Sequence, residues 1–332
     1  MSRASLIFGT LLAVLLPLSL LAGRVWIAPA DFGPGNTLLI LAELRLPRAV
    51  LAVVIGAGLG AAGAAMQGYL RNPLADPGLF GIAPMAALGA VASFWLAPML
   101  PPALAAWSLP IMALIGAALG MAALALIAGR TASDAAGGAG GGIALFTLAG
   151  LMLGSLAGAM TALAITLAPS PFALSEIVLW LNGALTDRSW REVMIAAPLT
   201  IAGIAVLALA ARSLDALTLG AEAARSLGLD PARLLALLVV GVGLTVGAGV
   251  AVAGIIGFVG LVVPHLVRPL TDRMPSSLLL PSALAGACLV LAADAIVRAL
   301  PFVTELRLGI ALSLIGAPFF GWLLLRMRRG RL

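Results

Sequence analysis

Residues that usually carry enzyme chemistry are scarce in this chain of 332 residues. All nineteen basic side chains are arginines, so no lysine is present to reach nucleotide phosphates or to form a Schiff base. The single histidine, His265, and the single cysteine, Cys288, cannot build a zinc cluster or a nucleophile–base pair with an orienting group. We therefore expect no enzymatic activity, and no metal or cofactor bound by this chain.

One acidic side chain lies within an apolar run, with an arginine one helical turn away. Asp294 and Arg298 have the i, i+4 spacing at which side chains meet on a helix. A carboxylate inside a membrane is by default a candidate for a proton or substrate path. Because Asp294 is near the end of its run, a structural ion pair with Arg298 is favoured, and we place no proton relay there.

The apolar composition requires a membrane. Hydrophobic residues make up 62% of the chain and charged residues 10%, and the mean hydropathy is +1.17. A soluble domain carries roughly 25% charged residues. The net charge of +6 is scattered at the ends of apolar runs, without the basic stripe of a nucleic-acid-binding protein. We expect a lipid bilayer around the chain and no nucleic acid as a partner.

Ten apolar runs predict an all-α bundle of about ten transmembrane helices in a single membrane domain, 1–332. The runs are about 4–23, 49–69, 79–100, 105–128, 143–168, 193–211, 234–253, 255–267, 278–297 and 308–325. Glycines and Pro264 interrupt 234–267, which makes this pair the least regular. The run Gly137–Gly142 is expected to break any helix and to form a flexible cytoplasmic connection.

Arginine placement predicts the orientation of the bundle. With a cytoplasmic N-terminus, ten crossings return the C-terminus to the cytoplasm and put twelve arginines inside and seven outside. This excess obeys the positive-inside rule. Four G-x-x-x-G pairs also predict close helix packing inside the bundle. They are Gly56/Gly60, Gly116/Gly120, Gly154/Gly158 and Gly243/Gly247.

Several segments resemble one known family in their order and spacing. The stretch 45–81 reads R-L-P-R followed later by R-N-P-L-A-D-P-G, and 250–270 reads V-A-V-A-G-I-I-G-F-V-G-L-V-V-P-H-L-V-R-P-L. Together with 279–326 and the loop 214–230, they are similar to the FecCD/BtuC-type permeases. These are the membrane subunits of ABC importers for ferric siderophores, haem and cobalamin. The matches cover most of the chain.

The resemblance implies a docking surface on the outer face. Arg45 and Arg48 match the family's Arg-x-Pro-Arg, and Arg298 ends the ninth run. In this family such arginines receive acidic residues of a periplasmic substrate-binding protein, and a guanidinium can hold a carboxylate bidentately. The alternatives are that arginines only anchor helix ends and that Arg298 only pairs with Asp294. The expected docking segments lie around 24–48, 169–192 and 298–307.

On the inner face, the loop 212–233 contains E-A-A-R-S-L-G, the E-A-A-x-x-x-G spacing of ABC-importer coupling loops. It predicts a short helix, broken at Gly228, that sits in a cleft of an ATPase subunit and transmits its closure. ATP and Mg would be bound by that partner. An amphipathic surface helix without a partner is the alternative. The coupling residues are expected to be Leu219, Gly220, Glu222, Ala223, Ala224 and Gly228.

The resemblance also implies a pair of identical chains with the substrate path on their two-fold axis, lined by the fifth and tenth runs. Small and mixed side chains there could pass a bulky chelate without holding it. The candidates are Thr147, Met152, Ser155, Met160 and Thr161. The inner gate is expected at Gly140, Gly141 and Gly142, where glycines replace the hydroxyl-bearing residues that the family leads us to expect.

The expected function is import across a bacterial inner membrane by alternating access, driven by two ABC ATPase subunits. The cargo would be an iron chelate delivered by a periplasmic binding protein, with ferric siderophore as first choice and haem or cobalamin next. The main alternative is an ion-coupled secondary transporter that works without an ATPase. That alternative needs ionisable residues at the midplane of the membrane, and the sequence does not mark any.

Overall fold

The structure is a computed structural model that describes residues 2–28, 36–133, 139–301 and 304–328. Throughout these residues the regular secondary structure is helical, which confirms the predicted all-α fold. In chain order the elements are α1 (Arg3–Leu21), α2 (Thr37–Ile40), the π-helix η2 (Leu41–Arg45), α3 (Leu46–Leu70), η3 (Pro77–Phe80), α4 (Ile82–Leu96), η4 (Ala97–Met99), α5 (Pro102–Ser133), α6 (Ala139–Thr166), α7 (Pro171–Leu181), α8 (Trp190–Leu217), α9 (Ala221–Ser226), α10 (Pro231–Ala253), α11 (Val259–Val267), η5 (Arg268–Leu270), α12 (Pro275–Ala299) and α13 (Leu308–Arg328).

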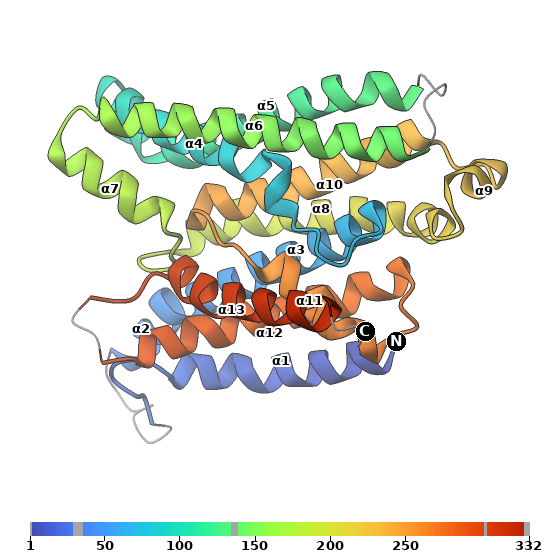
Figure 1. Ribbon diagram of the computed structural model, residues 1–332. Coiled ribbons are helices and arrows are strands. Elements are labelled where there is room, and N and C mark those ends of the chain that lie inside the picture. Colours follow the sequence, from blue (N-terminus) through green and yellow to red (C-terminus); the bar gives the residue numbers. More distant parts are fainter. Residues whose placement is uncertain (1, 29–35, 134–138, 302–303, 329–332) are drawn as a thin grey trace.

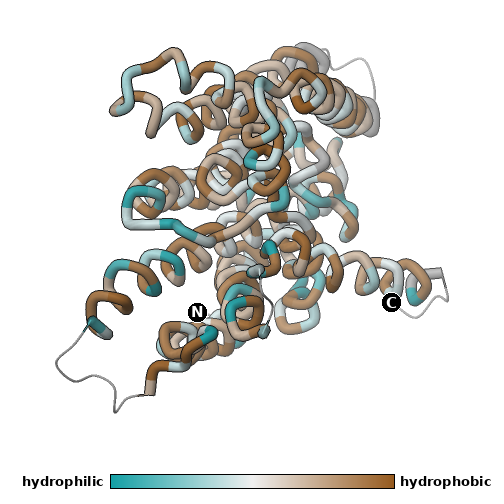
Figure 2. Tube along the Cα trace, turned by 90° about the vertical axis from the view of Figure 1, so that its left-hand side faces the viewer, coloured by the Kyte–Doolittle hydropathy of each residue, from teal (hydrophilic) through white to brown (hydrophobic). Residues whose placement is uncertain are grey.

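The long helices lie side by side and stack in layers (Figure 1). α1 packs on α12, α12 on α3, α3 on α8, and α8 on α10, while α5 joins α10 to α4 and α6. The central helices α3 and α10 are mostly buried, whereas α1 is mostly exposed and apolar. Seen along the helices, brown and pale colours dominate the bundle (Figure 2). Exposed apolar helices of this kind are stable only in lipid.

We call the end of α3 that carries Arg48 the outer end, and the end at Arg71 the inner end. In the described part of the chain, nine helices are long and apolar enough to cross a membrane. α1 begins and α13 ends at the inner end, where α9 also lies, and α7 lies at the outer end (Figure 1). The described chain thus starts and finishes at the same end of the bundle, which agrees with an even number of crossings.

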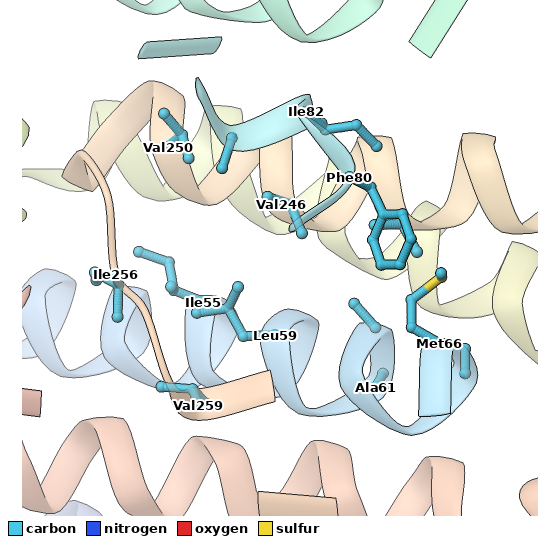
Figure 3. Packing of buried hydrophobic residues seen from close by; sticks show 14 of the residues in the cluster. Ile55, Leu59, Ala61, Met66, Phe80, Ile82, Val246, Val250, Ile256 and Val259 are labelled. Atoms are coloured by element: carbon cyan, nitrogen blue, oxygen red, sulfur yellow. The ribbon is translucent and has the colours of Figure 1, made fainter. Parts of the chain in front are cut away.

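The crossing predicted from the eighth run, 255–267, is only partly helical. α10 ends at Ala253, residues 254–258 are not helical, and α11 is a helix of nine residues. At the outer end the Ala184 amide donates to the Ala253 carbonyl at 2.8 Å. Towards the inner end Arg268 donates to the side-chain oxygen of Gln67 at 3.0 Å. The segment therefore traverses the bundle between α10 and α3 (Figure 3), and its non-helical part lies where glycines interrupt the predicted pair of runs over 234–267.

The break starts where a side chain has no room. Gly254 has a φ of +74°, and a Cβ there would overlap the carbonyl oxygen of Trp180. Glycine adopts such a conformation without steric cost, and it permits the close backbone approach. The helix therefore ends at this point, and the chain continues beside the outer loop that joins α7 to α8.

Two further predictions about helix boundaries need correction. α2 and η2 run directly into α3 as one helix over Thr37–Leu70, so the helix begins well before the predicted run 49–69, and Pro47 lies inside it. The π turn of η2 precedes Pro47, where the ring of a proline crowds the carbonyl one turn back. α6 begins at Ala139, so Gly140–Gly142 are helical, and Gly137 lies outside the described residues. A helical glycine costs only about 1 kcal/mol, less than unpaired backbone groups in lipid.

Close glycine packing, which the G-x-x-x-G pairs predicted, joins α3 to α12. A Cβ at Gly56 would overlap the Gly286 carbonyl oxygen, and a Cβ at Gly60 would overlap that of Ser282. Gly116 lies against the Met85 carbonyl in the same way. Gly158 differs, because it has open space around its Cβ position. Small residues thus set the distance between neighbouring helices, as packing in lipid requires.

We predict that Gly56→Val destabilises the folded protein by about 1–3 kcal/mol, because the added methyl groups force α3 and α12 apart. Gly9→Val is the matched control, since no atom lies within 4 Å of the Cβ position of Gly9. Thermal unfolding of both variants in the same detergent measures the difference. Equal midpoints for the two variants would show that the close approach of α3 and α12 does not exist.

Candidate functional site: an outer arginine cluster and an inner coupling helix

A buried carboxylate organises the outer end of the bundle. Asp294 is 1% exposed and lies between two arginines from different parts of the chain. Arg48 of α3 donates to Asp294 Oδ1 from Nη2 at 2.7 Å and from Nε at 3.0 Å. Arg298 Nε lies 3.0 Å from Asp294 Oδ2, which confirms the predicted i, i+4 pair. One carboxylate thus holds α3 against α12.

The same arginines bind further partners. Arg48 also bonds the carboxylate of Glu305, in the loop before α13. Arg298 Nη2 donates to the carbonyl and the hydroxyl of Ser19 in α1, at 3.0 and 2.8 Å. Burial opposes ionisation of Glu305, but the hydrogen bond and charge of Arg48 prevail and lower its pKa. Glu305 is therefore ionised at neutral pH, and the cluster ties three helices to an outer loop.

The third arginine predicted for docking, Arg45, caps the C-terminal end of α1. It donates to the carbonyl oxygens of Leu20, Leu21 and Val25 at 2.8, 3.0 and 2.7 Å. The last carbonyls of a helix have no partner within the helix, and a guanidinium is well placed to satisfy them. Within the described residues, Arg45 forms no salt bridge to a carboxylate.

These arginines line an outer cavity of about 310 Å³. Its charged lining consists of Arg24, Arg45, Arg48, Arg188, Arg298, Asp187 and Glu305. Five guanidinium groups thus face two carboxylates, so the cavity carries excess positive charge. A concave surface with excess positive charge attracts anions and strengthens their binding as water is excluded.

Arg188 is the member of this cavity that sequence reasoning missed. It lies in the loop between α7 and α8, and its Nε is buried without a hydrogen-bond partner among the described residues. Burial lowers its pKa, partly offset by the charges of Glu192 and Asp187. A guanidinium stays protonated in such surroundings, so Arg188 presents a charge that still lacks full compensation. The sequence signal was an arginine within the predicted docking segment 169–192.

The predicted coupling segment forms a separate helix at the inner end. α9 covers Ala221–Ser226, between Gly220 with a φ of +100° and Gly228 with a φ of +87°. Neither glycine has an atom within 4 Å of its Cβ position, so backbone conformation alone requires glycine there. Glu222 and Ala223 are exposed, whereas Ala224 is buried against the bundle.

Two leucines flank α9 and face outward. Leu219 is 66% exposed and Leu227 is 68% exposed, in a segment that projects from the inner end of the bundle (Figure 1). Leu219 was predicted to take part in coupling, and Leu227 was not. Exposed leucines that rim a helix outside the membrane form a small apolar surface of the kind that partner proteins cover.

The predicted path residues lie on α6, away from the outer cluster. Met152, Ser155 and Met160 are exposed, and Thr147 and Thr161 are half-buried. Thr147 Oγ1 donates to the carbonyl of Ile143 in the preceding turn, at 2.9 Å. The three glycines predicted as inner gate are in the first turn of this helix. α6 therefore offers a mixed, accessible face, and it packs on α4, α5 and η3.

α13, the other predicted path helix, borders a second cavity of about 370 Å³. The cavity lies between α7, the break and α13, and Ser313 supplies a hydroxyl that donates to the Gly309 carbonyl at 2.7 Å. α13 packs on α11 and α12. The two predicted path helices thus belong to different sides of the bundle.

The FecCD transport family model matches residues 11–326 of this chain. The chain belongs to that family. The Hemin transport system permease protein HmuU of Yersinia pestis is 38% identical over 289 residues, which are 87% of this chain and 84% of HmuU. The Vitamin B12 import system permease protein BtuC of Klebsiella pneumoniae is 37% identical, over 96% of this chain and 92% of BtuC. The Fe(3+)-citrate import system permease protein YfmE of Bacillus subtilis is 35% identical, over 97% and 94%.

A solved structure has the same fold as this FecCD family member. It is described as an inward-facing conformation of a transporter assigned to the metal-chelate ABC type. The TM-score is 0.85 at 27% sequence identity, and the match covers 97% of this chain and 98% of the other. Nine helices of its described residues are long and apolar enough to cross a membrane, and this FecCD protein is a multi-pass protein of a bacterial inner membrane.

We predict that Asp294→Ala destabilises the protein by about 3–5 kcal/mol, because it leaves the buried Arg298 and Arg48 without their shared carboxylate. The matched control is Arg191→Ala, which breaks a more exposed pair with Glu192 at the same end and costs at most about 1 kcal/mol. Thermal unfolding in detergent distinguishes the two. If Asp294→Ala lowers the unfolding temperature no more than Arg191→Ala does, Asp294 does not hold the helices together at the outer end.

Proposed function

We propose that this FecCD permease is the membrane subunit of an ATP-driven importer. Two copies would assemble with two separate ATPase subunits, which bind ATP and Mg, and with a periplasmic binding protein. The observation that carries the proposal is α9, a short helix held between two glycines outside the bundle with exposed leucines beside it. A lone transporter has no need of such a surface at its inner end.

The position of α9 suits the transmission of motion. It is joined directly to the inner end of α8 and, through residues 227–230, to the start of α10. α8 and α10 pack on each other, and α10 leads to the break at 254–258. Displacement of α9 by a closing ATPase would therefore move two crossings together. This is the motion that alternating access requires.

The outer cavity suits a partner that presents a carboxylate. Arg48 and Arg298 are engaged with Asp294, Glu305 and Ser19, so their main contribution would be to hold the cavity in shape. Arg188 and Arg45 both line the cavity, and neither forms a salt bridge to a carboxylate of the described residues. We therefore place the contact with an acidic side chain of the binding protein on these two arginines. Charge complementarity of this kind sets the orientation and rate of docking.

The proposed cargo is a metal chelate, with a ferric siderophore as first choice and haem or cobalamin next. The relatives are named for hemin, vitamin B12 and Fe(3+)-citrate, which are metal chelates of different shapes. The accessible face of α6 carries methionine, serine and threonine without a charged group from Ile143 to Thr166. Flexible methionines and small hydroxyls can line a wide path without binding one chelate tightly.

We predict that an ATPase subunit co-purifies with the wild-type chain and is lost in Glu222→Ala/Gly228→Pro. Proline cannot adopt the φ of +87° seen at Gly228, so the end of α9 must change. Leu227→Asp should also weaken the complex by placing a charge in its apolar contact. Ser276→Ala, which alters an exposed residue at the inner end outside α9, is the control. If the ATPase co-purifies equally with every variant, α9 has no coupling role. The same conclusion follows if no ATPase co-purifies even with the wild-type chain.

We predict that Arg188→Glu weakens binding of the periplasmic binding protein by about tenfold or more, with a smaller salt dependence of the remaining affinity. Arg191→Glu reverses a charge at the same end of the bundle but outside the cavity, and should change the affinity much less. Binding is measured in lipid nanodiscs at two salt concentrations. The docking assignment fails if the two reversals weaken binding equally.

A further inference from the structure

A proline interrupts the hydrogen bonding of α11, and a side chain of α3 compensates for it. Pro264 has no amide hydrogen, so the Gly260 carbonyl one turn earlier lacks its usual partner within the helix. Gln67 Nε2 donates to this carbonyl at 3.4 Å and to the Leu261 carbonyl at 3.1 Å. The side-chain oxygen of Gln67 accepts from Arg268 Nη2 at 3.0 Å. The guanidinium of Arg268 is therefore fixed to α3 through a buried partner.

Arg268 still has a donor to offer. Its Nε is buried without a hydrogen-bond partner among the described residues, and so is Nδ1 of His265, three residues earlier. Positions three apart lie on the same face of a helix, so these two side chains are neighbours. A buried polar atom without a partner costs free energy, which a ligand can recover by bonding to it. This face of α11 therefore offers polar atoms to a ligand.

α13 brings another basic group to the same place. α11 and α13 lie side by side (Figure 1), and the ring of Phe319 is 6.2 Å from that of His265 and 5.8 Å from that of Trp322, between centroids. The guanidinium carbon of Arg326 lies 5.4 Å from the centre of the Trp322 ring. A row of rings thus connects His265 to Arg326 in the last turn of α13. Trp322 and Arg326 are exposed, so a ligand can reach them.

We call His265, Arg268 and Arg326 the inner basic cluster. Within the described residues, the salt bridges lie at the outer end and involve none of its members. Asp272 follows Arg268 by four residues, but its carboxylate accepts from the Met274 amide at 3.0 Å, within its own turn. Asp76, in the loop beside α11, is likewise bonded to an amide of its own turn. The inner basic cluster thus keeps its positive charge.

The inner basic cluster stands at the end of an uncharged surface. α13 carries no charged residue from Leu308 to Leu325, and α6 carries none from Ile143 to Thr166. The outer cavity, at the opposite end of the bundle, also has excess positive charge. With α6 and α13 as the path helices, a cargo would meet positive charge where it enters and again where it leaves. Positive charge at both ends attracts anions and disfavours cations.

We propose that the inner basic cluster binds the cargo as it leaves the path, and that this cargo is a metal chelate with free carboxylate groups. A guanidinium can hold a carboxylate through two parallel hydrogen bonds. The rings of Phe319 and Trp322 would contact the apolar part of the chelate. A neutral or cationic chelate would gain nothing from the charges. The inference rests on the proposed function, because it requires α13 to line the path.

The first part of the test measures local charge with thiol reagents. In a Cys288→Ala background, Leu325→Cys places a thiol beside Arg326, at a position that is 57% exposed. The chain is purified in detergent without an ATPase, and its rates of modification by a sulfonate-bearing and a trimethylammonium-bearing methanethiosulfonate are compared. The ratio of the anionic to the cationic rate should fall several-fold in Arg326→Gln and in Arg268→Gln. Arg326→Lys keeps the charge and should keep the ratio.

The second part uses two chelates of iron as probes. Ferric citrate carries free carboxylates, and ferrichrome is a neutral hydroxamate chelate. At equal concentrations, ferric citrate should slow modification of Leu325→Cys by uncharged methyl methanethiosulfonate several-fold, and ferrichrome should not. Arg326→Gln should abolish this protection, and Arg326→Lys should retain it. The matched control is Arg212→Gln, which removes an exposed arginine near the inner end of α8 and should change neither the protection nor the rate ratio.

The inference is overturned if the two chelates protect equally or if ferric citrate does not protect. It is also overturned if Arg326→Gln and Arg212→Gln change the rate ratio equally, as expected of arginines that only anchor helix ends. Arg326 is exposed, so Arg326→Gln decides the test even where Arg268→Gln does not fold. Because no ATPase is present, these failures leave the proposed function standing. The proposed function fails separately, when no ATPase co-purifies with the wild-type chain.

Discussion

Inside a bilayer, a backbone amide or carbonyl must find its partner within the protein, and the structure of this chain depends on that constraint. Ten crossings would be simplest as ten continuous helices. One crossing instead is interrupted at 254–258, and its ends are held by specific contacts: the outer end by the Ala184 amide, the inner part by Gln67. The close glycine packing of α3 and α12 places the rest of the bundle around this interrupted segment. Polar contacts are few, so each one fixes an arrangement of helices.

The two ends of the bundle have different features, a charged cluster at the outer end and an exposed short helix at the inner end, and each matches its proposed role. At the outer end Asp294 is shared by Arg48 and Arg298, and this sharing makes a rigid cavity whose remaining arginines can attract an anion. At the inner end α9 is small, exposed and connected to the bundle at both of its ends. In the proposed function, the outer cavity would receive the partner that delivers cargo, and α9 would receive the partner that supplies energy.

The sequence predicted most of the fold, because a local run of apolar residues indicates each crossing. It also predicted the segments that carry the outer cluster and α9. It could not predict the partners of those residues. Arg48 and Asp294 are 246 positions apart, and no local pattern indicates that they meet. The same reason hid the path of residues 71–81, whose short motif predicts only a turn, although Pro77 lies against Gly260 of α11. The start of α6 at Ala139 was not predicted, since glycine-rich runs form loops in water but can be helical where backbone groups need partners within the protein.

Cargo uptake by reconstituted vesicles tests the central claim most directly, since energy supplied by a separate ATPase distinguishes this account from an ion-coupled transporter. The vesicles contain the chain, its ATPase subunits and the binding protein loaded with a candidate chelate. We expect that uptake requires ATP on the side of α9 and continues when ionophores abolish every ion gradient. Uptake that proceeds without ATP and stops when the ion gradients collapse would contradict it.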